Sequence, residues 1–168
     1  MSNAAPQFKG VIRPATYEDC LTLAPNLRQE DKDEVWESHG YLPEEALIIS
    51  FKASPNAQVG TINGEIVCMF GVAPDEDSHR GSPWMLASDL IKDVSGEFLR
   101  RDKEVLRGMS AGYTFLFNYA WSKNTMHLRW LKWLGFTIDK DPVPIGRNRE
   151  IFYGFYKFNE EQQCLPLV

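Results

Sequence analysis

The chain is poor in cysteine and in positive charge. Its three cysteines, Cys20, Cys68 and Cys164, are odd in number and widely spaced, with no CxxC pair and no Cys/His cluster. This pattern argues against a disulfide framework and a zinc site, so we expect reduced cysteines. Lys and Arg number 18 against 23 Asp and Glu, which leaves a net charge of -5. Because phosphate binding depends on an excess of Lys and Arg, the composition argues against nucleic acid as the main partner.

Long hydrophobic runs are also absent. The apolar stretches fall far short of the roughly 20 residues that a membrane-spanning helix needs, and the first ten residues, MSNAAPQFKG, contain no apolar segment of a secretory signal. We therefore expect a cytoplasmic protein. At 168 residues, with 43% apolar and 24% charged residues, the chain predicts a single domain over residues 11–158. A flexible N-terminus at 1–10 and a C-terminal tail at 159–168 are expected on either side.

The first third of the chain predicts one strand and three helices. Residues 11–14 favour a short strand, and Thr16 and Asp19 then have the spacing of a capping box. Pro25 should kink or shorten the helix that follows. The charged segment 28–40 predicts a second helix that ends at a glycine, with its acidic run on a solvated face. A third helix is expected from residue 43, where proline suits the first turn.

The remainder predicts a hairpin, two helices and further strands. Asn63-Gly64 permits the two positive φ values of a type I′ turn, so 57–62 and 65–73 should pair as a hairpin. The other expected elements are a strand at 83–91, a helix at 93–112, a doubly buried strand at 114–121, a helix at 124–135, a strand at 136–139, a loop at 141–149 and a closing strand at 150–158. This order predicts an α/β domain with a mixed sheet.

Three stretches resemble the GNAT superfamily of N-acetyltransferases. Residues 11–27, VIRPATYEDCLTLAPNL, look like its first strand and helix, and 63–72, NGEIVCMFGV, look like its central hairpin. Asn124 opens a short helix that closes on Gly135-Phe136, as in the closing motif of the superfamily. The resemblance extends over nearly the whole chain. It implies the acyl-CoA N-acyltransferase fold, a mixed and mostly antiparallel sheet flanked by helices.

A narrower resemblance concerns a phage family. The stretch PWMLASD at 83–89, the long basic helix, the run 117–136 (FNYAWSKNTMHLRWLKWLGF) and the closing aromatic strand are similar to internal virion protein A of short-tailed phages. That resemblance implies a phage-encoded protein made in the host bacterial cytoplasm and possibly carried in the virion. Its implied role is to build or stabilise internal virion structures. Its implied partners are other virion or assembly proteins, with a homo-oligomer as a further possibility.

The cofactor loop departs from the GNAT pattern. A working GNAT binds the pyrophosphate of acetyl-CoA with backbone N–H groups at a helix N-terminus, in a loop with several glycines. The equivalent segment 91–96 has one glycine, and it places the carboxylate of Asp93 where an anion would lie. These departures argue against a bound cofactor. If acetyl-CoA does bind, the resemblance implies these contacts: Lys92, Ser95, Gly96 and Asn124.

The proton donor of the superfamily is missing as well. Many GNATs carry a tyrosine seven residues after the closing-motif Asn, where it protonates the departing thiolate. That position is Leu131 here, which has no proton to give. Tyr113 and Tyr119 lie nearby in sequence, but strand alternation predicts that they belong to the core. The catalytic residues therefore remain unknown.

A general base is equally hard to identify. His127 falls in the first turn of the closing helix, where packing or a structural hydrogen bond is favoured over catalysis. A carboxylate of Glu65 or Asp89, on strands that border a GNAT cleft, is the alternative base acting through water. His79 lies in the acidic loop at 74–83 and is expected to face solvent, and Ser88 has no His-Asp partners in a recognisable catalytic arrangement.

Two functions follow from these observations. The first is a virion structural or assembly protein that keeps the GNAT scaffold without catalysis. For this role Trp130 and Trp133 are candidate partner-binding residues, one of which is expected in the core. The second is an acetyl-CoA-dependent N-acetyltransferase with a divergent cofactor loop. Neither hypothesis requires a metal ion.

Overall fold

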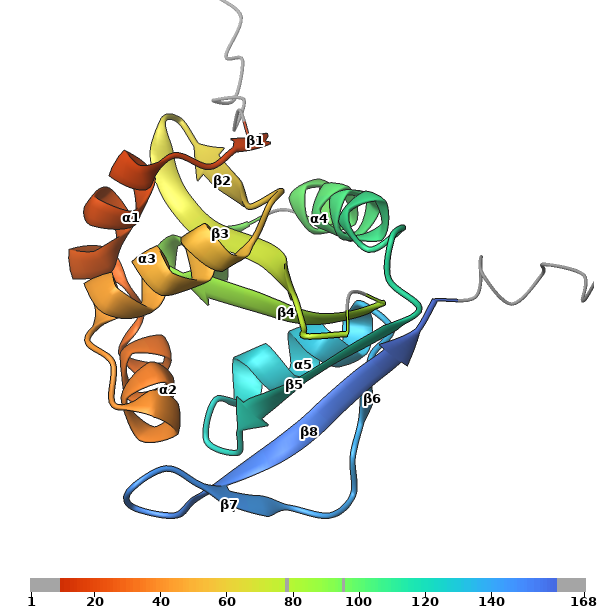
Figure 1. The fold of residues 1–168 in the computed structure, drawn as a ribbon. Helices are drawn as coiled ribbons and strands as arrows, with labels where there is room; N and C mark the ends of the chain where they lie inside the picture. Colours follow the sequence, from red (N-terminus) through yellow and green to blue (C-terminus); the bar gives the residue numbers. More distant parts are fainter. Residues whose placement is uncertain (1–9, 78, 95, 160–168) are drawn as a thin grey trace, which may run out of the picture.

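The structure, a computed structural model, describes residues 10–77, 79–94 and 96–159 (Figure 1). Its first elements are β1 (Gly10–Pro14), α1 (Tyr17–Leu23), the 3-10 helix η1 (Ala24–Asn26), α2 (Gln29–His39), α3 (Pro43–Ala53), β2 (Gln58–Ile62), β3 (Glu65–Pro74) and β4 (Arg80–Ala87). They are followed by the 3-10 helix η2 (Asp89–Asp93), α4 (Gly96–Met109), β5 (Phe115–Trp121), α5 (Thr125–Trp133), β6 (Thr137–Ile138), β7 (Val143–Ile145) and β8 (Glu150–Phe158).

All strands belong to one sheet with the order β1-β2-β3-β4-β5-β8-β6, and β7 also pairs with β8. Every pairing is antiparallel except that of β4 with β5, which is parallel. The predicted mixed, mostly antiparallel sheet is therefore confirmed. The single parallel pair divides the sheet into an N-terminal half, β1–β4, and a C-terminal half, β5–β8.

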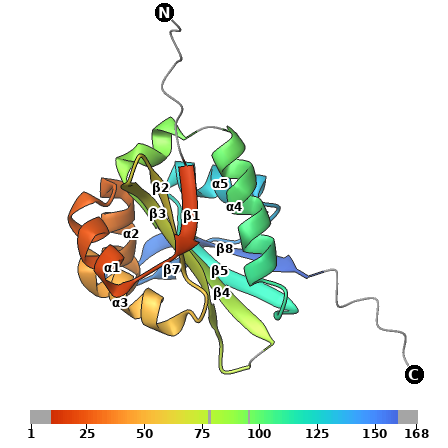
Figure 2. The same ribbon diagram turned by 90° about the horizontal axis from the view of Figure 1, so that it is seen from above.

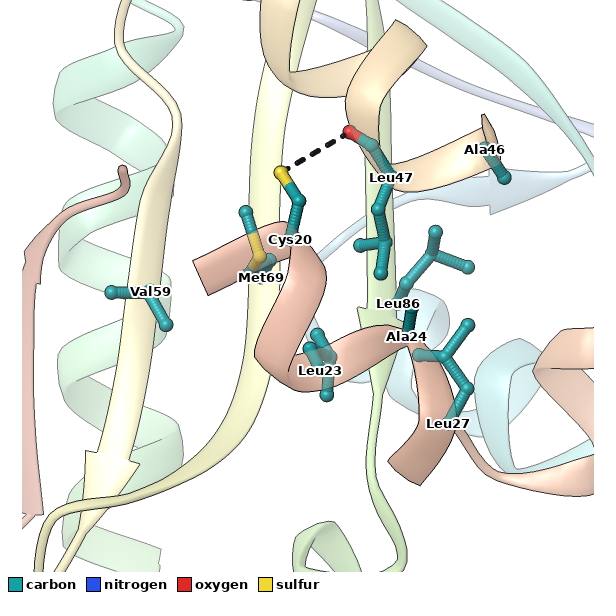
Figure 3. Packing of buried hydrophobic residues seen from close by; sticks show 9 residues of the cluster. All are labelled: Cys20, Leu23, Ala24, Leu27, Ala46, Leu47, Val59, Met69 and Leu86. Atoms are coloured by element: carbon teal, nitrogen blue, oxygen red, sulfur yellow. Dashed lines mark hydrogen bonds between the residues drawn. The ribbon is translucent and has the colours of Figure 1, made fainter. Parts of the chain in front are cut away.

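Helices cover both faces of the sheet. The helices α1, α2 and α3 lie on one side, and α4 and α5 lie on the other (Figures 1 and 2). On the α1–α3 side, Cys20, Leu23 and Leu47 pack against Met69 and Leu86 of the sheet, as Figure 3 shows. The other side has two clusters, the first around Phe98 of α4 and the second around Leu131 of α5. Each face therefore has its own apolar core.

Several local structures that the sequence predicts are present. The capping box is present: the N–H of Asp19 donates to Oγ1 of Thr16 at 3.4 Å, and the N–H of Thr16 donates to Oδ2 of Asp19 at 2.8 Å. The helix α1 ends before Pro25, and α2 ends at Gly40 in the left-handed conformation. The turn between β2 and β3 has positive φ at Asn63 and Gly64, 50° and 81°.

Three predictions about elements were wrong in part. The strand expected at 83–91 begins earlier, at Arg80, and ends at Ala87, because residues 89–93 turn into η2. The loop expected at 141–149 contains β7, which pairs with the edge of β8. The strand β5 is not buried on both faces, since only Leu116, Ala120 and Trp121 of its residues are buried. Tyr119 is 39% exposed there and is not a core residue.

The remaining expectations concern cysteines and the chain ends. Cys20 and Cys68 are buried thiols, and the Sγ of Cys20 donates to the carbonyl of Leu47 at 3.7 Å (Figure 3). Cys164 and most of the two expected terminal segments lie outside the described residues; Gly10 already belongs to β1. Within the described part of the chain, no helix is long and apolar enough to cross a membrane.

Candidate functional site: the cleft between β4 and β5

The parallel strands β4 and β5 separate along their length. Only two residue pairs are in register, Arg80 with Phe115 and Gly81 with Leu116, although both strands continue well beyond them. Further along, the side chain of Asn118 bridges the gap by donating from Nδ2 to the carbonyl of Pro83 at 2.9 Å. A V-shaped opening in a sheet leaves backbone groups unpaired, so other parts of the protein must supply their hydrogen bonds.

Five polar residues fill the wide end of this opening, and we call them the cleft cluster: Arg28, Asp31, Glu34, Asn124 and His127. Arg28 Nη2 donates to Asn124 Oδ1 at 2.7 Å and lies 3.3 Å from Asp31 Oδ1. Asn124 Nδ2 donates to Asp31 Oδ1 at 2.9 Å and to Glu34 Oε2 at 2.7 Å. His127 Nδ1 is 3.3 Å from Glu34 Oε1. The cluster therefore joins α2 on one face of the sheet to α5 on the other.

Residues of the cleft cluster also form hydrogen bonds with the backbone at the end of β4. The N–H of Ala87 donates to Asp31 Oδ2 at 2.9 Å, and the carbonyl of Ala87 accepts from the N–H of Arg28 at 2.9 Å. Asn124 precedes α5 but does not cap it with its side chain, which is fully buried in the cluster instead. Both main-chain groups of Ala87 are thus bonded within the protein.

Charge in the cleft cluster is balanced by close pairing. Burial raises the pKa of Asp31 above its ordinary range, and the charge of Arg28 opposes that effect. Burial alone would lower the pKa of His127, but the charge and hydrogen bond of Glu34, with the charge of Asp31, outweigh it and raise that pKa. The two neighbouring carboxylates thus favour the charged form of His127 by more than burial disfavours it. The expectation that His127 makes a structural hydrogen bond agrees with this contact.

Beneath the cluster, a small cavity lies between α4, α5 and β4. The space open to the centre of a water molecule is about 20 Å³, enough for one or two waters. Its walls are mostly apolar and include Met85, Leu131 and Trp130. Leu131, at the position of the tyrosine proton donor, is 2% exposed. The side chains of α5 thus close the cleft rather than line an open channel.

Asp102 is the one acidic side chain in the wall of this cavity. It is 2% exposed, and among the described residues neither of its carboxylate oxygens has a hydrogen-bond partner. Burial raises the pKa of Asp102 to about 7, with Arg101 opposing the effect. The Nε1 of Trp130, in the same wall, likewise lacks a partner within that part of the chain.

The segment equivalent to the pyrophosphate loop of GNATs has an exposed acidic side chain among its described residues. Residues 89–93 form η2, and the Nζ of Lys92 is 3.1 Å from Oδ1 of Asp89. Asp93 is exposed and lies with Asp89 and Glu65 along an acidic groove of about 690 Å³. Gly96 begins α4, and Ser95 lies outside the described residues. Asn124 belongs to the cleft cluster and Lys92 pairs with Asp89, so the four contacts implied for acetyl-CoA stay predictions.

The two tryptophans predicted to bind a partner differ in exposure. Trp130 packs in the apolar clusters beside α4. Trp133 is 41% exposed, with the Nζ of Lys103 5.1 Å from its ring centroid. Only Trp133 is thus available at the surface, and a partner for it stays a prediction.

Sequence reasoning missed four residues of this site: Arg28, Asp31, Glu34 and Asp102. The acidic run of α2 was expected to face solvent, but Asp31 is 4% exposed and its partners lie about 90 residues away in sequence. One signal was present, the spacing of Asp31 and Glu34, which places both on one side of a helix. For Asp102 the signal was its position four residues after Phe98 on the apolar face of α4.

A sheet that opens between one parallel pair, with helices on both faces, defines the GNAT fold, and the comparisons with solved structures agree. A putative acetyltransferase from Salmonella typhimurium, yncA, solved with its cofactor acetyl-CoA, is 15% identical with a TM-score of 0.68, over 95% of this chain and 98% of the other. Spermidine N-acetyltransferase from Vibrio cholerae, in complex with CoA and spermine, is 11% identical with a TM-score of 0.64, over 92% and 98%. At these identities the likeness establishes the fold alone.

A family comparison adds a more particular similarity. Residues 78–141 match the family described as bacteriophage T7, probable scaffold protein Gp13. The matched stretch runs from β4 through α5 and so contains both strands of the cleft and Asn124. No curated protein matches the chain. The fold is therefore that of the acetyltransferases, whereas the detectable family similarity is to a phage scaffold protein.

Proposed function

We propose that this chain is a phage-encoded assembly protein of the virion interior that keeps the GNAT fold without acetyltransferase activity. The observation that carries the proposal is the closed cleft. Asp31 bonds the N–H of Ala87 where the strands separate, and the remaining space below is about 20 Å³. Binding pockets for small molecules usually measure about 300 Å³ or more. The residues present therefore do not fit the pantetheine arm of acetyl-CoA.

Two further features support an assembly role. At the place of the pyrophosphate loop, Lys92 is paired with Asp89 and the exposed carboxylate of Asp93 would repel a phosphate. The similarity of residues 78–141 to a probable scaffold protein points to other virion or assembly proteins as partners. Exposed Trp133 beside Lys103 is the proposed contact residue on α5. The protein would act in the host bacterial cytoplasm during assembly and would be retained in the virion if its partners are.

The second candidate function is an acetyl-CoA-dependent N-acetyltransferase. It is favoured by the fold shared with enzymes solved with CoA, and by the pair of His127 and Glu34, which are chemically suited to move a proton. This function requires the cleft cluster to open, because Asn124 and the N–H of Ala87 are bonded within the protein.

An acetyl-CoA titration separates the two functions. We expect no change in the melting temperature at millimolar acetyl-CoA, with the Salmonella relative as a positive control in the same assay. A ligand present at a hundredfold its Kd stabilises a protein by about 2.7 kcal/mol. A saturable rise of that size would overturn the proposed function. If it occurred, Leu131→Tyr would then test whether a restored proton donor gives transfer of the acetyl group.

A further inference from the structure

The two helix layers carry opposite charge. The helices α1–α3 hold nine acidic and two basic side chains, whereas α4 and α5 together hold six basic and three acidic ones. Asp102 on the α4–α5 side and Asp19 and Asp31 on the α1–α3 side are buried, so they do not contribute to the charge of either surface. Because the layers lie on opposite faces of the sheet (Figure 2), the molecule has an acidic face and a basic face.

Several charges on the two faces are exposed and unpaired. On the basic face, the side chains of Arg107, Arg129 and Lys132 make no hydrogen bond or ion pair with any described residue. On the acidic face, the carboxylates of Glu18 and Glu44 likewise make no hydrogen bond or ion pair with any residue that the structure describes. Exposed, unpaired charges of opposite sign are suited to contacts between molecules.

Both faces also expose large apolar side chains. The acidic face presents Tyr17, Leu21, Trp36 and Ile49, each at least 40% exposed, and Leu42 at the start of α3 is 59% exposed. The basic face presents Trp133 at 41%. Aromatic residues with an apolar patch and a charged rim are typical of protein–protein interfaces.

We propose that the acidic α1–α3 face of one molecule binds the basic α4–α5 face of a second copy. The contact is heterologous, because it joins two different surfaces, and repeated contacts of this kind form rings or open filaments. The inference deepens the proposed assembly function by naming a partner. A nucleic acid would meet only the basic face and would be repelled by the acidic one, in a chain of net charge -5.

Sedimentation velocity of the full chain at low salt and at about 0.5 M NaCl tests the contact, because salt screens exposed charges. We expect the average mass to rise with concentration at low salt and to fall toward the monomer at high salt. A mass that stays monomeric at low salt, or an association that does not weaken with salt, overturns the inference.

Charge reversal tests which faces meet. The basic-face variant carries Arg107→Glu, Arg129→Glu and Lys132→Glu, and the acidic-face variant carries Glu18→Lys and Glu44→Lys. Each alone should lose at least about tenfold in association, because like charges then face each other. Mixing the two should restore association, since each retains the natural face that the other needs. Circular dichroism confirms that both variants are folded.

Other outcomes contradict the inference in distinct ways. If either variant alone associates as strongly as the natural chain, the contact uses one face twice and is not head to tail. If the natural chain stays monomeric but binds a fluorescent DNA duplex, and the basic-face variant does not, the basic face serves nucleic acid. Neither result depends on whether the protein binds acetyl-CoA. The self-association proposal and the proposed function can therefore fail independently of each other.

Discussion

At the residue scale, Asp102 is the side chain whose surroundings least suit its charge. Its carboxylate is buried beside Leu106 and Trp130 in the cavity wall, with no hydrogen-bond partner among the described residues. A carboxyl group in that position is favoured in its neutral form, which explains why its pKa rises to about 7. Because the carboxyl group of Asp102 can ionise in this apolar position, the stability of the fold should depend on pH.

We predict that Asp102→Asn stabilises the protein at pH 8. An acid whose pKa is raised on folding contributes full stability below its ordinary pKa of 3.8, and that stability is lost as the pH rises toward 7. Each pKa unit corresponds to about 1.4 kcal/mol, so the gain at pH 8 should be at most about 4.5 kcal/mol. It should shrink progressively toward pH 4. Urea unfolding at several pH values measures it.

Asp93→Asn is the matched control for this measurement. Asp93 is exposed at the end of η2, so its amide should change the free energy of unfolding by no more than about 0.5 kcal/mol at any of these pH values. Equal gains at pH 5 and pH 8 for Asp102→Asn would show that its charge does not govern stability.

At the element scale, Phe98 is the buried aromatic ring of α4 in its apolar contact with the sheet. Phe98 is 3% exposed and lies over two glycines of neighbouring strands, Gly10 in β1 and Gly60 in β2. A Cβ on Gly60 would lie 2.6 Å from Cζ of this ring, and one on Gly10 would lie 2.8 Å from Cδ2. The glycines are therefore required for the close approach of α4 to the sheet.

We predict that Gly60→Ala destabilises the protein by about 1–3 kcal/mol, because the added methyl forces the ring of Phe98 out of place. Combining it with Phe98→Leu should cost less than the sum of the two single changes. Gly108→Ala is the control, since a Cβ there meets nothing within 4 Å and a helix favours alanine over glycine by about 1 kcal/mol. Strict additivity of Gly60→Ala and Phe98→Leu would exclude the contact as the cause.

At the scale of the whole molecule, the cleft cluster links the two halves of the sheet. Where β4 and β5 lose their register, Arg28 and Asp31 reach from the α2 side to Asn124 on the α5 side. Side chains thereby bridge the opening between β4 and β5. Charge pairing inside the cleft thus replaces strand pairing as the connection between the halves.

We predict that Arg28→Met loosens this connection. Removing one partner of a buried charge pair leaves Asp31 uncompensated and should cost about 3–5 kcal/mol. Hydrogen exchange should accelerate in α2 and α5 more than in the β2–β3 hairpin, because the hairpin does not touch the cluster. Lys32→Met, a neighbour on α2 outside the cluster, should leave both measurements nearly unchanged. Uniform acceleration across the sheet would contradict a local role in the cleft.

Much of the fold could be predicted because its signals are local. The capping box at Thr16, the turn at Asn63-Gly64 and the end of α2 at Gly40 each depend on the conformational preference of one or two residues. Alternation of such elements along the chain was enough to predict a mixed sheet with flanking helices. The errors lay at β4, β5 and β7, where strand ends and burial depend on neighbours distant in sequence.

What the sequence alone determined, then, is the order of elements, the GNAT scaffold and the absence of the tyrosine at Leu131. The tertiary structure decided what lies in the cleft. Asp31 belongs to an acidic run that was expected to face solvent, and Asn124 stands where a helix cap is expected. They meet only because the strands separate and leave the N–H of Ala87 in need of an acceptor. That long-range requirement, which hydrophobic periodicity does not reveal, places charged side chains of α2 in the opening between β4 and β5.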